Sequence, residues 1–138
     1  MPSAKPRFVD TNIFLRFLTA DLPVQADRCA VLVQRLRDGK EVAHMSPLAV
    51  AEIVWTLERY YKLPKAEVVA KVSPLLKLRG LRVAGKEVLL GALALYAGKR
   101  VSFTDAVIAV QMERAGVSEI YSYDQDFDRL DQVVRIEP

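Results

Sequence analysis

The chain has 138 residues, of which 51% are hydrophobic and 27% are charged, and its formal net charge is +3. This length and balance predict one globular domain over residues 1–138 and argue against a disordered chain. The single cysteine, Cys29, excludes an internal disulfide and a metal cage built from thiolates.

The first half of the chain alternates short apolar runs with helical patterns. Residues 1–6 are polar, contain two prolines and predict a flexible segment without an export signal. Ser46 followed by Pro47 is typical of a helix start, an N-cap with proline in the first turn. The pattern therefore predicts, in order, a strand over 7–10, a helix over 12–19, a helix that stops at Asp38-Gly39, a strand over 41–44 and a helix from 47 to 61.

The second half continues the alternation. It predicts a helix over 65–77, a strand over 81–83, an apolar helix over 86–97, a helix capped by Thr104 that ends at Gly116, and strands over 120–123 and 133–136. Short strands joined by helices predict a three-layer α/β/α fold with a central, mainly parallel β-sheet. The apolar run over 88–98 is too short to span a bilayer, so we expect a soluble, cytoplasmic protein with no membrane partner.

Four acidic residues occupy positions where parallel sheets present ligands, at strand ends and helix starts. Asp10 follows the first predicted strand, Asp124 follows the strand over 120–123, and Asp105 lies in the first turn of its helix. Glu52 differs, because it lies inside a helix among apolar neighbours and needs a partner, a cation or access to the surface.

Each of these acids also has an ordinary structural explanation. Asp10 is a possible helix N-cap, Asp105 favours the helix dipole, Asp124 suits a turn, and Glu52 suits a solvated helix position. Their joint occurrence is the informative feature. Gathered carboxylates repel one another, so a fold that collects them needs hard cations such as Mg²⁺ or Mn²⁺.

Basic residues form clusters that we expect to flank the gathered acids, and they predict a polyanionic partner. The clusters are Arg35, Arg37 and Lys40, and Lys77, Arg79, Arg82 and Lys86; Arg16, Arg100 and Arg129 are further candidates for phosphate contacts. The alternative is that these charges are solvated helix ends. His44 is the only histidine, which excludes a ribonuclease mechanism that uses two histidines as acid and base.

Four segments together resemble the PIN domain, in this order and over nearly the whole chain. They are Val9-Asp10-Thr11-Asn12, Ala51-Glu52-Ile53, Phe103-Thr104-Asp105-Ala106-Val107-Ile108-Ala109 and Tyr123-Asp124-Gln125-Asp126-Phe127. Within that superfamily, the single-domain length and the glutamate in the third helix are similar to VapC-type toxins of bacterial and archaeal toxin–antitoxin pairs.

The resemblance implies an Mg²⁺- or Mn²⁺-dependent endoribonuclease that acts on RNA, forms a homodimer and is held inactive by a small VapB-like antitoxin. It assigns the catalytic and metal-binding roles to Asp10, Glu52, Asp105 and Asp124. It adds Asp126 as a further acid of the last motif, and it places Asn12 and Thr104 at the border of the site.

The chemistry of the residues agrees with that implication. A cation held by carboxylates lowers the pKa of bound water and stabilises charge on a phosphoryl oxygen, so no protein nucleophile is required. An aspartyl phosphatase needs a second acid two residues after Asp10, where this chain has Asn12. A non-catalytic module that binds RNA or protein through the same fold is the alternative, because a fold alone does not determine function.

Overall fold

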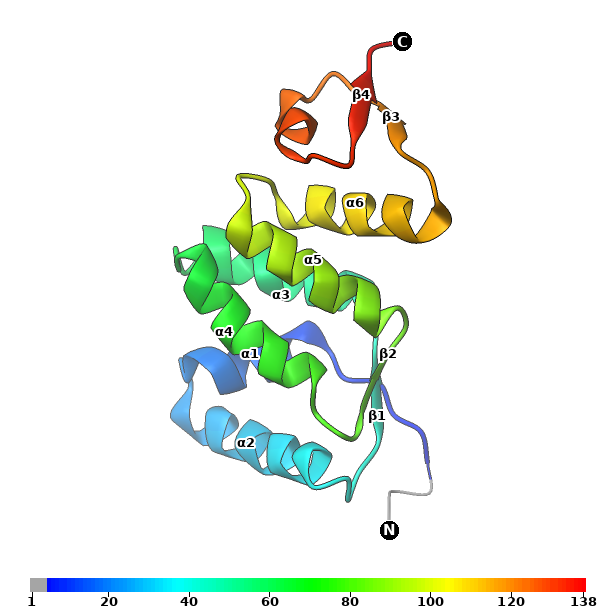
Figure 1. Cartoon of the computed structure of the whole chain (residues 1–138). Coiled ribbons are helices and arrows are strands. Elements are labelled where there is room, and N and C mark those ends of the chain that lie inside the picture. Colours follow the sequence, from blue (N-terminus) through cyan, green and yellow to red (C-terminus); the bar gives the residue numbers. More distant parts are fainter. Residues whose placement is uncertain (1–4) are drawn as a thin grey trace. The chain divides into compact units, whose positions relative to one another are not determined.

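The computed structural model describes residues 5–138, which belong to two compact units, Met1–Lys86 and Glu87–Pro138. Residues 1–4 of the predicted flexible segment lie outside the described residues, and Lys5 and Pro6 are exposed. The described elements, shown in Figure 1, are α1 (Thr11–Thr19), α2 (Pro23–Arg37), β1 (Ala43–Met45), α3 (Pro47–Arg59), α4 (Lys65–Leu76), β2 (Leu81–Val83), α5 (Lys86–Gly98), α6 (Phe103–Ala115), β3 (Glu119–Tyr121), the 3₁₀ helix η1 (Gln125–Arg129) and β4 (Val134–Ile136).

The strands of the first unit are parallel, as predicted. β1 pairs with β2, and His44 lies opposite Arg82 in this register. The predicted strand over 7–10 is reduced to one parallel bridge between Phe8 and His44. Pro6 has no amide hydrogen to donate and α1 begins already at Thr11, so little extended chain remains for pairing.

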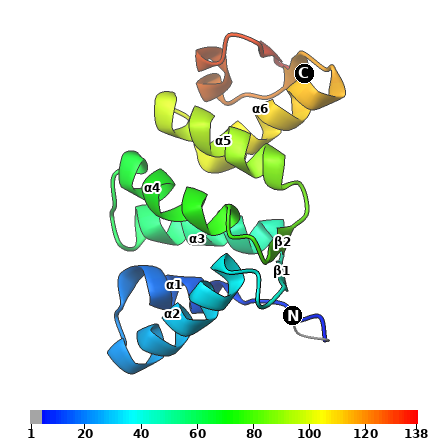
Figure 2. The same cartoon turned by 60° about the horizontal axis from the view of Figure 1, so that its bottom comes forward.

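Helices cover the rest of the first unit. α1 packs against α2 and α3, and α3 packs against α4; Figure 2 shows these neighbours side by side. Ser46 caps α3 through a hydrogen bond from the Leu48 amide to its Oγ (3.1 Å), and Pro47 is the first helical residue, which confirms that predicted helix start. Fully buried side chains that face the interior from these helices include Phe14, Leu36, Ile53, Leu57 and Leu76.

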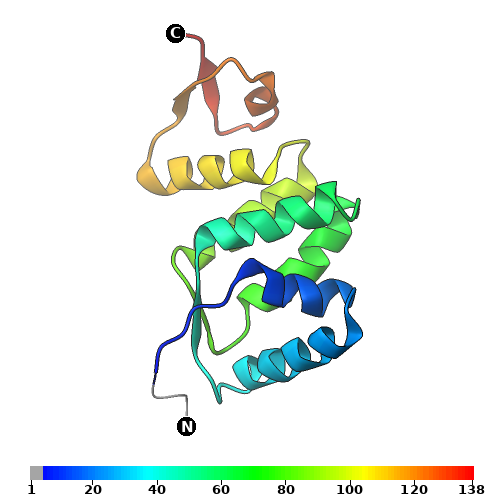
Figure 3. The same cartoon turned by 180° about the vertical axis from the view of Figure 1, so that it is seen from behind.

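The second unit contains α5, α6, β3, η1 and β4, and Figure 3 shows α6 leading into β3. β3 and β4 pair in parallel, with Ile120 opposite Arg135. The predicted cap at Thr104 is wrong, because Ser102 caps α6 by accepting the Asp105 amide at 3.1 Å. The earlier start brings Phe103 into the helix, where its buried ring meets that of Tyr96 edge to face at 6.0 Å between centroids.

The end of α6 is as predicted. Gly116 adopts a left-handed conformation (φ 71°) that glycine tolerates without strain, and its amide reaches back to the Met112 and Glu113 carbonyls.

Cys29 is a buried free thiol. Among residues 5–138, no helix combines the length and apolar character needed to cross a membrane.

Candidate metal centre

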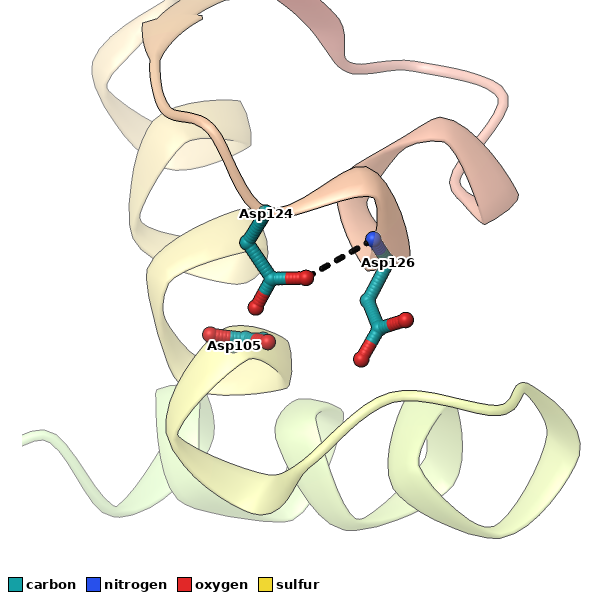
Figure 4. A group of neighbouring side chains, drawn as sticks. All are labelled: Asp105, Asp124 and Asp126. Atoms are coloured by element: carbon teal, nitrogen blue, oxygen red, sulfur yellow. Dashed lines mark hydrogen bonds between the residues drawn. The ribbon is translucent and has the colours of Figure 1, made fainter.

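Three carboxylates of the second unit lie together (Figure 4). Asp105, Asp124 and Asp126 each offer an oxygen, and these three oxygens lie within 4.8 Å of one another. Asp105 comes from the first turn of α6, Asp124 is the N-cap of η1, and Asp126 is in η1. Residues distant in sequence are thus brought to one point, and two of them, Asp105 and Asp124, belong to the four acids predicted to gather.

Backbone hydrogen bonds fix this arrangement locally. The Asp124 amide donates to Ser122 Oγ at 2.9 Å, and the Asp126 amide donates to Asp124 Oδ1 at 2.9 Å. One oxygen of Asp124 therefore closes the turn that presents Asp126. Figure 4 shows the carboxylates of Asp124 and Asp126 on the side of the turn that faces Asp105.

The crowding has an electrostatic consequence. Partial burial raises the pKa of Asp105 above its ordinary value, the nearby charges of Asp124 and Asp126 raise it further, and a hydrogen bond with Ser102 acts in the opposite direction. A group whose ionised form is disfavoured in this way gains when a cation joins it. Three carboxylates at this spacing are a donor set of hard oxygens, which suits Mg²⁺ or Mn²⁺.

Two arginines contact the segment that carries these acids. Arg129 Nη1 lies 2.7 Å from Asp126 Oδ1, and the same nitrogen donates to the Arg100 carbonyl. Arg135, in β4, holds Asp128 through two parallel hydrogen bonds of 3.1 and 3.2 Å. Arg129 was predicted as a phosphate contact; its pairing with Asp126 was not predicted.

The other two predicted acids lie in the first unit and share a neighbour, Thr11. Asp10 caps α1 by accepting the Thr11 amide at 2.8 Å, and the Thr11 hydroxyl donates to Glu52 Oε2 at 3.3 Å. Thr11 is 3% exposed, whereas both carboxylates are exposed. Glu52 therefore combines access to the surface with a polar partner, two of the solutions expected for a charge on an apolar helix.

The predicted site residues thus form two groups, Asp10 with Glu52 in the first unit and Asp105 with Asp124 and Asp126 in the second. A common site made from both groups stays a prediction. Asn12 and Thr104 are exposed neighbours of Asp10 and Asp105 in the chain. Thr11 is a site neighbour that sequence reasoning missed, although it stands between Asp10 and Asn12 in the quoted motif.

A hollow of about 480 Å³ next to Asp10 is lined by three arginines, two acids and six apolar residues. Arg7, Arg28 and Arg35 line it together with the exposed side chain of Phe8. Part of this charge is balanced internally, because Arg35 Nε lies 3.1 Å from the buried carboxylate of Glu41. Arg7 Nη1 also lies 4.0 Å from Glu41 Oε2, and the lining of the hollow keeps an excess of one positive charge.

Comparisons with known proteins identify the family of this chain. A family model described as the PIN domain matches residues 7–133. The VapC ribonuclease of Aquifex aeolicus (strain VF5) is 23% identical to this chain over 124 residues, which is 90% of this chain and 91% of that protein. The match confirms the predicted resemblance and, with six helices and parallel strands between residues 5 and 138, the predicted α/β fold class.

Proposed function

Because the chain belongs to the PIN domain family, we propose that it is a metal-dependent endoribonuclease that hydrolyses phosphodiester bonds of RNA. The observation that carries this proposal is the cluster of Asp105, Asp124 and Asp126, whose oxygens lie within 4.8 Å of one another. The similarity to a protein named VapC ribonuclease supports RNA as the substrate.

The cofactor of this proposal is Mg²⁺ or Mn²⁺. Asp105, Asp124 and Asp126 supply the hard oxygen donors that these ions prefer, and the pKa of Asp105 is raised first by burial and then by the negative charge of Asp124. When bound, the ion supplies an acidified water and stabilises charge on a phosphoryl oxygen. We assign Asp10 as the further central ligand on the basis of the family motif.

The protein side chains then bind the ion, orient the attacking water and position the substrate. Asp105 and Asp124 act as ligands directly or through water, and Asp126 completes the set. Glu52 is a ligand or orients the attacking water, and its hydrogen bond from Thr11 limits the directions in which its carboxylate points. Asn12 and Thr104 border the site, and the arginines beside Asp10 attract the phosphates of the substrate.

The biological role that we propose is the toxin of a VapBC-type pair, a cytoplasmic homodimer whose activity is blocked by a VapB-like antitoxin. The similarity to the Aquifex protein over 90% of the chain supports it. Expression of the chain alone should arrest growth, and Asp10→Asn should relieve the arrest. Equal toxicity of the Asp10→Asn variant would count against the toxin role.

The decisive experiment is cleavage of total cellular RNA by the purified protein in Mg²⁺, Mn²⁺ or EDTA. Asp10→Asn and Asp105→Asn variants, checked for folding by circular dichroism, serve as matched controls because each replaces one carboxylate by an amide of the same shape. We expect discrete fragments only with metal and only from the wild type. A wild type that binds RNA without cutting it in any buffer would favour the non-catalytic binding module.

A further inference from the structure

One arginine of β4 makes four polar contacts beside the acid cluster. Arg135 lies opposite Ile120 in the parallel pair of β3 and β4, and its side chain is only 14% exposed. Its guanidinium donates from Nε and Nη2 to the two oxygens of Asp128, at 3.1 and 3.2 Å, and from Nη1 to the Ser122 carbonyl at 3.2 Å. Glu137 adds a second carboxylate, 3.7 Å from Nη1.

These contacts fall on both sides of the acids. Ser122 precedes Asp124, and Asp128 follows Asp126, so one guanidinium holds both ends of the segment 122–128. The connection continues into the cluster, because Ser122 Oγ accepts the Asp124 amide and Asp124 Oδ1 accepts the Asp126 amide, both at 2.9 Å. A planar fork with several donors suits this task, whereas a lysine ammonium cannot reproduce a bidentate pair.

We infer that Arg135 is a positioning residue that fixes the segment 122–128, and with it the carboxylates of Asp124 and Asp126, in the geometry that receives the cation. The expected effect of Arg135 on metal affinity rests on the proposed metal-dependent function, whereas its hold on the segment 122–128 does not. Replacing a residue that holds a metal ligand in place by hydrogen bonds commonly lowers metal affinity by about 10–100-fold.

The test compares Arg135→Lys with Arg114→Lys, which changes an exposed arginine at the end of α6 in the same unit. The first measurement is amide hydrogen exchange of the metal-free proteins by NMR. We expect Arg135→Lys to lose protection at the Asp124 and Asp126 amides while the amides within α6 keep theirs. Unchanged protection at Asp124 and Asp126 would overturn the inference.

The second measurement is Mn²⁺ affinity by calorimetry, with Arg135→Lys expected to bind about tenfold more weakly than the wild type and Arg114→Lys expected to match it. Equal affinity of Arg135→Lys and the wild type would also overturn the inference. A wild type that binds no Mn²⁺ would refute the proposed function instead, and hydrogen exchange would still decide the role of Arg135. Asp128→Asn, which removes the negative charge and one of the two oxygens that accept from Arg135, should show the same loss of protection.

Discussion

Arg129 and Asp126 form an ion pair in which Nη1 lies 2.7 Å from Oδ1, so a candidate metal ligand is already neutralised by a neighbour from its own turn of η1. Both side chains are nearly half exposed, at 46% and 42%. An exposed pair of this kind contributes roughly 0.2–1 kcal/mol, which a cation arriving at Asp126 must overcome.

Arg129→Gln should therefore tighten Mn²⁺ binding by up to about fivefold, because it removes a competing ion pair that contributes roughly 0.2–1 kcal/mol. Calorimetric titration of Mn²⁺ into the wild type and the variant checks this. Arg114→Gln is the matched control for the loss of one positive charge. Weaker binding by Arg129→Gln would show that Arg129 supports the site rather than competing with the cation.

The raised pKa of Asp105 makes the stability of the metal-free protein depend on pH. Burial is the main cause, so the folded state binds a proton more tightly than the unfolded chain, whose ordinary value is 3.8. The contribution of Asp105 to the free energy of unfolding is fully present below that value and is lost as pH rises through the higher pKa of the folded state. In EDTA, Asp105→Asn should have a higher Tm than the wild type at neutral pH, and the difference should vanish in acid.

Thermal unfolding in EDTA, followed from below the ordinary value of 3.8 up to neutral pH, measures this difference. Asp131→Asn, at an exposed position of the same unit, controls for the loss of a negative charge. A Tm difference that is equal at all pH values would contradict the electrostatic origin. Added Mg²⁺ should stabilise the wild type more than Asp105→Asn.

His44→Ala should keep most of the metal-dependent cleavage, because the mechanism needs no histidine. His44 is half-buried in β1, and its ring lies 5.7 Å from that of Phe8, a packing role. The rate of RNA cleavage in Mg²⁺, compared with that of Asp10→Asn, checks the prediction. A folded but inactive His44→Ala protein would require a different mechanism.

Gly80→Ala should destabilise the first unit. A Cβ at Gly80 would lie 2.0 Å from the Glu41 carbonyl oxygen, and the Gly80 amide donates to the Leu36 carbonyl at 2.8 Å, so the backbone on both sides must move. The expected loss is at least about 1–3 kcal/mol of unfolding free energy in urea denaturation. Gly98→Ala, where a Cβ meets nothing within 4 Å, should be neutral or slightly stabilising.

Local signals predicted the helices well, because capping and periodicity act within a few residues. Ser46-Pro47 and Gly116 mark the ends where the structure has them. The cap of α6 was misplaced at Thr104 because Ser102 has the same capping chemistry, and the burial of Phe103 decides between the two. The first strand was overestimated, because strand pairing depends on a distant partner and only Phe8 finds one.

The sequence by itself determined the family, because its short motifs resemble the PIN domain in their order and a PIN-domain model matches residues 7–133. The roles of the four acids stay a prediction. Only the tertiary structure decided that Asp126 stands with Asp105 and Asp124, that Thr11 links Asp10 to Glu52, and that Arg135 holds the acid-bearing segment. The contact of Thr11 with Glu52 spans 41 positions of the chain, and that of Arg135 with the Ser122 carbonyl spans 13. The first depends on the packing of α1 against α3 and the second on the parallel pairing of β3 with β4, and no local pattern of residues encodes either.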